Sequence, residues 1–424
     1  MTRQDLSSLD CDVLIVGGGP AGLSLAASLG QAGLTATVLE LQSAEQLAQP
    51  AADGREIALT HPSVALLQRL GSWQRLDAHD IGLLRAAQVH DGPVGGAQPL
   101  HLHAGGTGVE QLGWIVPNHA LRRSAWEVAS TSPGVRLLTG ARVLQVGVQA
   151  GHAEVQYLPA GAPEGASQRL RAALVVAADS RFSSARRQLG IGAAMTDFGR
   201  TVIVCRMRCE HPHDQVAHEC FGYERTLAIL PLPDDVVDGA PLCSAVVTAD
   251  SAQAQALLAL PAQEFAERVA EQFGHRLGAM QLLGERHAYP LVAVYAHRFT
   301  GPRCALLGDA AVGMHPVTAH GYNLGLAGVA SLSAALADAR ARGLDIGAPD
   351  VLQRYARAHH LHAWPIFQGT NAIVRLYTDT RRLPRLARRA VLGAALRLPP
   401  LQAAIVSQLT GRAPAWPVRL PAGG

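Results

Sequence analysis

The segment GDAAVGMHPVTAHGYNLGL, residues 308–326, contains residue types that could bind an anionic group. Asp309 follows a glycine, a His-Pro pair ends at Pro316, and a Gly-Tyr-Asn triplet begins at Gly321. The apolar run CALLG at 304–308 predicts a buried strand, and the residues after Gly321 predict the start of a helix. A loop between a strand and a helix points backbone N–H groups toward an anion. We therefore expect a phosphorylated or enolate-like group to bind at this segment.

A second set of residues near the start of the chain predicts nucleotide binding. The sequence GGGPAG at 17–22 matches the pattern GxGxxG, with Ala21 inside it. Gly17 permits a tight turn, Gly19 lets the backbone approach a pyrophosphate, and Gly22 lets a helix pack on a strand. Glu40 ends the next predicted strand, at the separation where a carboxylate reaches a ribose hydroxyl. These residues fit NAD and FAD equally well.

The elements that must position these residues alternate along the chain. CDVLIVGGGPAGLSLAASLGQAGLTATVLE reads as strand, glycine turn, helix and strand, which is a βαβ unit. LRAALVVAADSRFSSARRQLG and CALLGDAAV each read as a buried strand followed by a loop. Strand-like runs bounded by Pro, Gly and Asp predict a separate sheet between about residues 187 and 289. Beyond residue 347 the pattern is mostly helical.

Composition excludes several classes of protein. The chain has 424 residues, which suggests two or three domains of about 100–200 residues each. It is 48% hydrophobic and 16% charged, which is typical of a globular protein. The net charge of only +3, with no uniformly basic domain, argues against a dedicated nucleic-acid-binding protein. No run reaches the roughly 18 apolar residues of a membrane span. The start lacks the order of a signal peptide, and the cysteines are scattered, so we expect a reducing, cytoplasmic location.

Two later segments resemble a known family. AADSRFSSAR at 177–186 and the segment at 308–326 are similar to the motifs A-D-G-x-x-S-x-x-R and G-D-A-x…P…G-x-N-x-G of the FAD-dependent aromatic-ring hydroxylases with the para-hydroxybenzoate hydroxylase fold. The matching residues are Asp179, Ser183, Arg186, Asp309, Pro316, Gly321, Asn323 and Gly325. Ser180 departs from the family, which usually has glycine there. An NAD dehydrogenase has no reason to carry both motifs, so the resemblance favours FAD.

Within that family, the chain most resembles the hydroxylases of ubiquinone biosynthesis. This resemblance extends over nearly the whole chain. It rests on ADGREIALTHPSVALLQRLG, ERTLAILPLP, YPLVAVYAHRFTGPRCALLGDAA and the tail from residue 380. Val312 replaces a frequent histidine of that group, and His320 replaces its usual glutamine. The resemblance implies an NAD(P)H-dependent monooxygenase that uses noncovalent FAD and dioxygen. Through a C4a-hydroperoxyflavin it would hydroxylate the ring of a polyprenylated phenol or benzoquinol, such as a demethoxyubiquinol.

The same resemblance implies roles for individual residues. Asp179 and Asp309 would contact the cofactor, and Asp309 would do so at the ribityl-phosphate. Backbone N–H groups from Gly321 through Tyr322 to Asn323 would stabilise negative charge on the reduced flavin, helped by the helix dipole. Pro316 and His320 would lie at the site of oxygen chemistry.

Two further residues have implied roles with simpler alternatives. Arg55 would lie beside the flavin ring or its entry path, as a catalytic and cofactor-binding residue, and a surface salt bridge is the alternative. Asn118 stands where relatives contact the cofactor with Gln or Arg, and a cap or turn is the alternative. For Asp309 the alternative is a helix N-cap.

These observations predict an α/β fold built from three parts. A Rossmann-like FAD-binding domain would comprise residues 1–85, 106–186 and 290–346. An antiparallel substrate-binding sheet would be inserted as residues 86–105 and 187–289, and residues 347–424 would form a helical C-terminal region.

We expect no metal site. The run CRMRCEHPHDQVAHEC at 205–220 is rich in Cys and His, but its spacing is not C-x₂-C, and Cys205 and Cys209 would share the core-facing side of a strand. His359, His360 and His362 would lie on a solvated or partly packed helix face.

The expected partner is a polyprenylated aromatic small molecule, with membership of a ubiquinone-biosynthesis complex as a further expectation. RRLPRLARRAVLGAALRL at 381–398 could lie on an anionic membrane surface or could simply pack as a helix. Two rival functions remain: a flavin-dependent reductase of prenyl double bonds, and a noncatalytic flavin-binding subunit of a biosynthetic complex.

Overall fold

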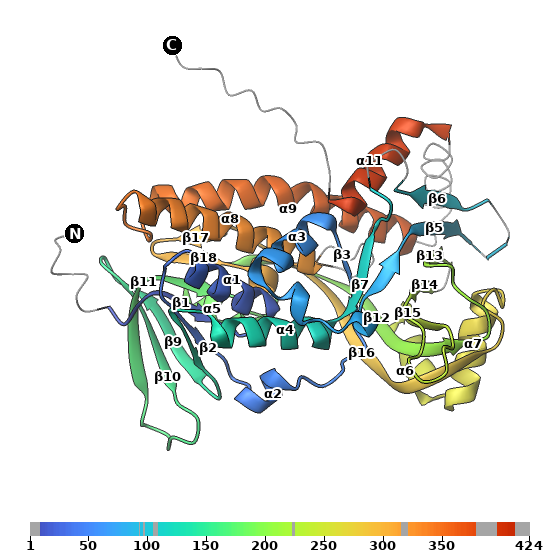
Figure 1. The fold of residues 1–424 in the computed structure, drawn as a ribbon, viewed down its shortest axis with the longest axis horizontal. Coiled ribbons are helices and arrows are strands. Elements are labelled where there is room, and N and C mark those ends of the chain that lie inside the picture. Colours follow the sequence, from blue (N-terminus) through green and yellow to red (C-terminus); the bar gives the residue numbers. More distant parts are fainter. Residues whose placement is uncertain are drawn as a thin grey trace, which may run out of the picture.

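The computed structural model describes residues 9–92, 94–95, 98–104, 109–222, 225–314, 321–378 and 397–411 (Figure 1). A mainly parallel sheet and a mainly antiparallel sheet lie side by side, with helices packed on each (Figure 1). The predicted α/β class is confirmed.

The parallel sheet carries the glycine turn. Its central strands run in the order β18, β11, β1, β2, β8, and every neighbouring pair among them is parallel. Their bounds are β1 Cys11–Val16, β2 Ala36–Leu39, β8 Val135–Leu138, β11 Gln168–Ala177 and β18 Cys304–Leu306. β17 (Thr300–Gly301) pairs antiparallel at the edge, and β9 (Arg142–Val148) and β10 (Ala153–Leu158) form a hairpin that extends β11. β2 is buried on both faces, which explains why its sequence does not alternate between apolar and polar residues.

Helices cover the parallel sheet. The long ones are α1 (Pro20–Gln31), α4 (Asn118–Thr131), α8 (Gly321–Ala341) and α9 (Pro349–Thr378), and α8 and α9 run side by side across the top of Figure 1. By length and hydropathy α8 could cross a membrane, contrary to the expectation that no segment would qualify. However, 56% of its apolar window is buried inside the protein, where it packs against α1, α3 (His61–Leu70) and α9. Its apolar composition is therefore that of a core helix.

The second sheet has eight strands in the order β19, β16, β12, β15, β14, β13, β5, β6. Their bounds are β5 Ala86–Asp91, β6 Leu100–His103, β12 Ala193–Cys209, β13 Val216–Phe221, β14 Thr226–Pro231, β15 Leu242–Asp250, β16 Met280–Ala296 and β19 Val312–Gly313. All pairs are antiparallel except β13 with β5, which is parallel. α6 (Ser251–Ala259) and α7 (Ala262–Gln272) pack on one face. The domain boundaries stay a prediction.

A small third sheet joins the two larger ones. It consists of β3 (Glu56–Leu59), β7 (Gly113–Pro117) and β4 (Gly82–Leu84), all antiparallel. The remaining elements are α2 (Ala44–Ala48), α5 (Ser184–Gln188), α11 (Pro399–Thr410) and the short 3-10 turns η2 (Trp73–Arg75), η3 (Ala78–Asp80) and η4 (Gly308–Ala310).

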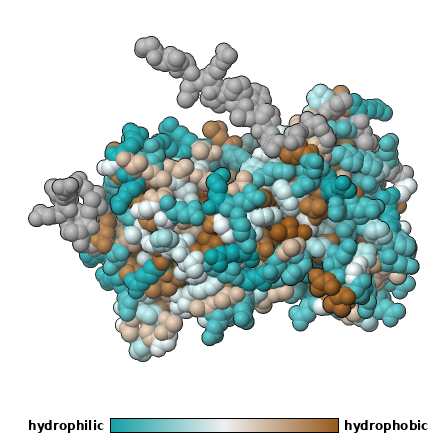
Figure 2. Space-filling view, in the orientation of Figure 1, coloured by the Kyte–Doolittle hydropathy of each residue, from teal (hydrophilic) through white to brown (hydrophobic). Residues whose placement is uncertain are grey.

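Hydrophilic side chains with smaller hydrophobic patches cover the face seen in Figure 2.

Candidate cofactor and active site

Four loops meet at one edge of the parallel sheet. Because β1, β2, β11 and β18 are parallel neighbours, their carboxyl ends lie together. The residues that follow these strands begin with Gly17, Glu40, Ala178 and Leu307. Open α/β sheets bind their ligands at this edge.

The glycine turn leaves room at one glycine and none at the other two. Gly17 has φ +110°, and a Cβ there would lie 2.5 Å from the carbonyl oxygen of Ala178. A Cβ on Gly22 would lie 2.1 Å from the carbonyl oxygen of Gly17. A Cβ on Gly19 would meet no atom within 4 Å. The fold itself therefore requires Gly17 and Gly22, whereas Gly19 borders open space at the start of α1, where a pyrophosphate could approach.

Glu40 is held at the end of β2 by two backbone groups. Its Oε2 accepts a hydrogen bond from the Gly18 N–H at 2.6 Å, and its Oε1 accepts one from the Gln42 N–H at 2.8 Å. The carboxylate is thereby oriented beside the glycine turn. This position fits the predicted ribose contact.

The predicted A-D-G-like segment links the loop after β11 to the loop after β18. Asp179 Oδ2 accepts from the Ser184 N–H at 3.0 Å, while Oδ1 is buried without a hydrogen-bond partner among the described residues. Ser183 caps α5 by accepting from the Arg186 N–H at 2.9 Å. Arg186 is buried, and its Nη1 donates to the carbonyl oxygen of Ala310 at 2.8 Å. Arg186 thus has a structural role, and the unsatisfied oxygen of Asp179 is an acceptor that a cofactor hydroxyl could use.

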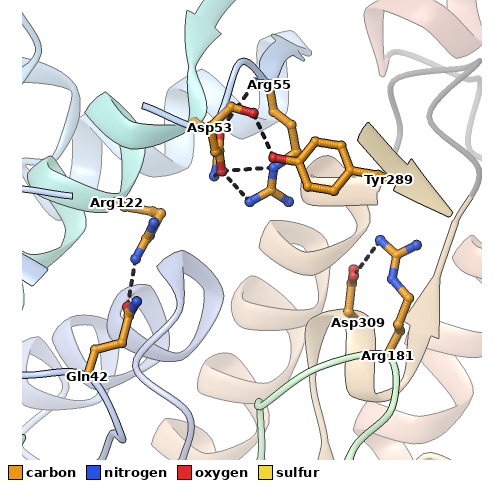
Figure 3. Close-up of polar contacts among 8 residues, drawn as sticks. Gln42, Asp53, Arg55, Arg122, Arg181, Tyr289 and Asp309 are labelled. Atoms are coloured by element: carbon orange, nitrogen blue, oxygen red, sulfur yellow. Dashed lines mark hydrogen bonds and ion pairs between the residues drawn. The ribbon is translucent and has the colours of Figure 1, made fainter. Parts of the chain in front are cut away.

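Asp309 lies in η4, and its side chain caps no helix among the described residues. Its Oδ2 accepts from Arg181 Nη2 at 3.2 Å, and the two side chains point toward each other in Figure 3. Asp309 is 39% exposed, so its carboxylate also faces outward from the sheet edge. Ala21 packs against this loop, because a Cβ on Gly308 would lie 3.3 Å from the Ala21 Cβ. Ala21 therefore spaces α1 from η4.

Arg55 belongs to a polar cluster that also includes Asp53, Tyr289 and Asn118. Its Nη2 donates to Asp53 Oδ2 at 2.6 Å, and its guanidinium lies 5.6 Å from the centre of the Tyr289 ring (Figure 3). Asn118 donates from Nδ2 to the same Asp53 oxygen at 2.8 Å, so Asn118 does not act as a cap. Burial raises the pKa of Asp53, but the hydrogen bonds and charge of Arg55 outweigh it and hold the pKa below its usual range. Arg55 thus forms a salt bridge, which was the alternative to a role beside the flavin. Its side chain is 46% exposed and so remains accessible.

Sequence reasoning missed the pair Arg122 and Gln42. Arg122 Nη2 donates to Gln42 Oε1 at 2.7 Å, across from the Arg55 cluster in Figure 3. Gln42 also donates its backbone N–H to Glu40, so the pair extends the site along the end of β2. The available signal was the helical spacing of four residues between Asn118 and Arg122, which places both on one face of α4.

The start of α8 is anchored to β3 by Asn323. Its Oδ1 accepts from the Thr60 N–H at 3.0 Å, and its Nδ2 donates to the Ala58 carbonyl oxygen at 2.8 Å. The side chain is thus used within the protein, which leaves the backbone for any cofactor contact. Tyr322 has a buried hydroxyl, and burial raises its pKa. Gly321 begins the helix, and Pro316 and His320 lie outside the described residues.

The expected core position of the cysteines is confirmed. Cys205 and Cys209 lie in β12 and are buried. The histidines of α9 differ from one another: His359 is only 2% exposed, and the other two are exposed. Among the described residues, one group of side chains has metal-like spacing, and it consists of Asp77, His79 and Asp80. Arg123 donates to both of those aspartates, which explains their proximity.

The arrangement defines a dinucleotide-binding protein, and comparisons with known proteins give its cofactor and family. A model described as an FAD binding domain matches residues 10–370. The chain is 43% identical to the ubiquinone hydroxylase UbiM of Neisseria meningitidis, with 95% of this chain and 85% of that protein covered. It is 35% identical to the ubiquinone hydroxylase UbiL of Rhodospirillum rubrum, with 92% and 87% covered.

A solved structure supports the same fold. The p-nitrophenol 4-monooxygenase PnpA of Pseudomonas putida superposes with a TM-score of 0.74 at 19% identity, covering 95% of this chain and 98% of that one. The chain therefore belongs to the FAD-binding flavoprotein monooxygenase family that includes the ubiquinone hydroxylases. FAD is its cofactor, and the open space at Gly19 and the unsatisfied Asp179 oxygen fit that group.

Proposed function

We propose that this protein hydroxylates the aromatic ring of a polyprenylated phenol or benzoquinol in ubiquinone biosynthesis, such as a demethoxyubiquinol. The observation that carries the proposal is the 43% identity to a ubiquinone hydroxylase over 95% of the chain, together with the converging loops of the FAD edge. When bound, FAD supplies dioxygen activation with electrons from NAD(P)H.

The protein's own residues would hold and orient the FAD. Gly19 and the first turn of α1 face the pyrophosphate, and Glu40 faces the ribose. Asp179 and Asp309 bind the cofactor along the sheet edge, and backbone N–H groups of Gly321, Tyr322 and Asn323 stabilise negative charge there.

The reactive side of the site is assigned to three further residues. Arg55, fixed by Asp53 and by Asn118 through that carboxylate, lies beside the ring or its entry path. Pro316 and His320 border the oxygen chemistry as proposed catalytic residues.

The location follows from the substrate. A polyprenylated ring resides in lipid, so we propose a cytoplasmic protein that works at the inner face of the membrane, with contact through its C-terminal region. Membership of a ubiquinone-biosynthesis complex would serve the same end. The basic stretch at 381–398 on which membrane contact depends lies outside the described residues, except for its last two.

The test is quinone profiling by mass spectrometry in a strain that lacks the protein. The proposal predicts that one demethoxy or deoxy intermediate accumulates and that expression of the wild type restores the mature quinone. An unchanged quinone pool would refute the pathway assignment. An accumulated species with extra prenyl double bonds would instead support a prenyl reductase, and restoration by a variant unable to bind FAD would support a noncatalytic subunit.

A further inference from the structure

The two faces of the second sheet differ in how they are covered. One face packs against α6 and α7 and is fully covered, since its neighbours Cys205, Ala245 and Ile229 on β12, β15 and β14 are each 0% exposed. The other face, here called the loop face, carries the residues that alternate with these along each strand. Its Val246 and Leu230 are partly exposed. The loop face is therefore the one that is open to a small molecule.

The segment around Arg55 lies against the loop face. Tyr289 Oη donates to the carbonyl oxygen of Asp53 at 2.7 Å, and a Cβ on Gly54 would lie 3.1 Å from Val204 Cγ2. Tyr289 and Val204 belong to one apolar cluster on this face. The Arg55 guanidinium in turn lies over the Tyr289 ring (Figure 3). The proposed cofactor edge therefore borders the loop face at β12 and β16.

A carboxyl lies in the same row of side chains across the sheet. Register partners follow one another from Val204 on β12 to Val246 on β15, Ala228 on β14 and Glu219 on β13. Directly opposite residues of neighbouring antiparallel strands project from the same face. With about 4.8 Å between strands, Glu219 lies about 14 Å across the sheet from Val204. That distance is too long for contact between the Arg55 segment and Glu219, and it leaves room for one aromatic ring between them.

Glu219 is a partly buried carboxyl without a partner. No described residue forms a hydrogen bond or an ion pair with its side chain, and its neighbours in the row are Ala228 and Val89. Arg206, which also projects from the loop face, donates from Nε to Glu56 Oε1 at 2.9 Å instead. Burial raises the pKa of the Glu219 carboxyl to about 8, so at neutral pH it is mostly protonated and can donate as well as accept a hydrogen bond. A ligand oxygen would satisfy a group that the fold leaves unsatisfied.

We propose that Glu219 binds a ring oxygen of the aromatic substrate on the loop face. The proposal rests on the proposed function and names the group that selects its substrate. The class selected is a phenol or quinol without a ring carboxylate, because an anion there would lie beside a carboxyl and apolar side chains. A ring held between Glu219 and the Arg55 segment also has one side toward the proposed cofactor edge, so Glu219 orients the ring for hydroxylation.

The test measures binding to the FAD-loaded protein by the change in flavin absorbance, which reports ligands that lie beside the flavin. The probes are ortho-prenylphenol, prenylbenzene, which lacks the ring oxygen, and a prenylphenol with a para carboxylate. We expect the wild type to bind the phenol about 10- to 100-fold more tightly than prenylbenzene, the ratio that a hydrogen bond to a buried carboxyl supplies. The carboxylated probe should bind at least about tenfold more weakly than the phenol.

The variants separate this contact from general effects of charge and folding. Glu219→Leu should reduce the preference for the phenol to less than about threefold, whereas Glu219→Gln, which keeps a donor and an acceptor, should retain most of it. Because an unpartnered buried carboxyl costs stability, Glu219→Leu should keep its FAD and unfold at the wild-type temperature or above. Glu285→Leu is the control, since Glu285 is an exposed carboxyl on β16 of the same sheet. It should leave the preference unchanged.

An undiminished preference in FAD-loaded Glu219→Leu would overturn the proposal, as would an equal loss in Glu285→Leu. A merely structural role for Glu219 would lower the unfolding temperature of Glu219→Leu and leave its preference intact. Failure of the proposed function looks different. In that case the phenol preference would depend on Glu219, but the wild type would hydroxylate none of the probes.

Discussion

The glycine turn permits a sharp test because two of its glycines have opposite surroundings. An alanine at position 22 would place its Cβ 2.1 Å from the Gly17 carbonyl oxygen, more than 1 Å inside the ordinary contact range that starts at 3.4 Å. An alanine at position 19 would meet no protein atom within 4 Å. Gly22→Ala should therefore damage the fold, and Gly19→Ala should damage only the binding of FAD.

The size of the stability loss depends on the atom that the added Cβ contacts. Overpacking costs about 1–3 kcal/mol, and a rigid backbone carbonyl puts Gly22→Ala at or above the top of that range. Alanine returns about 1 kcal/mol through its higher helix propensity. The net loss of about 2 kcal/mol should lower the Tm of the FAD-free protein by roughly 2–3 °C. Gly19→Ala should leave that Tm within about 1 °C and weaken FAD binding at least about tenfold, since its methyl would occupy the approach of the pyrophosphate.

The assay is differential scanning fluorimetry of the FAD-free proteins, combined with titration of FAD by flavin fluorescence. Gly147→Ala in β9 is the control, because a Cβ there also meets no atom within 4 Å. Gly147 also lies outside the four loops at the carboxyl ends of the parallel strands. Unchanged FAD affinity in Gly19→Ala would show that Gly19 does not border the pyrophosphate, and an undisturbed Tm in Gly22→Ala would show that the fold does not require Gly22.

Three other perturbations follow from the same structure. Asn323→Leu leaves the buried Thr60 N–H without its acceptor, so the free energy of unfolding measured in urea should fall by about 2–4 kcal/mol, and an unchanged midpoint would contradict this role. Arg122→Met removes the bond to Gln42 and should weaken FAD binding severalfold by titration, with Tm nearly unchanged; equal affinity would exclude Arg122 from the site. Burial lowers the pKa of His359 to about 4, below the 6.5 of the unfolded chain, so wild-type stability should decline as pH falls from about 6.5 toward 4. Denaturation at pH 7.5 and 5 should show about 2 kcal/mol less decline in His359→Leu, and an identical decline would show that other groups dominate.

The motif residues could be predicted because their geometry is local. Gly17, Gly19, Gly22 and Glu40 follow from one βαβ unit, whose turn and strand lengths fix where each of them lies. The fold class followed from the alternation of apolar runs. Family resemblance supplied the identity of the cofactor, which the glycine pattern alone left open.

The contacts between distant segments could not be predicted. Glu56 and Arg206 are 150 residues apart, and their meeting depends on how the third sheet packs against β12. The side chain of Asn323 illustrates the same limit, since the sequence pointed only to its backbone N–H and gave no sign that the side chain joins α8 to β3. The parallel pairing of β13 with β5 likewise depends on the whole sheet, because sequence pattern sets which faces are buried but not which strands are neighbours.

We propose that this chain uses FAD to insert an oxygen atom from dioxygen into a prenylated aromatic ring. The most direct measurement supplies the purified FAD-loaded protein with NAD(P)H, ortho-prenylphenol and isotopically labelled dioxygen, and follows the products by mass spectrometry. We expect a hydroxylated ring that carries one labelled oxygen atom, formed together with oxygen consumption. Saturation of the prenyl double bond under anaerobic conditions, or a hydroxyl group whose oxygen comes from water, would contradict it.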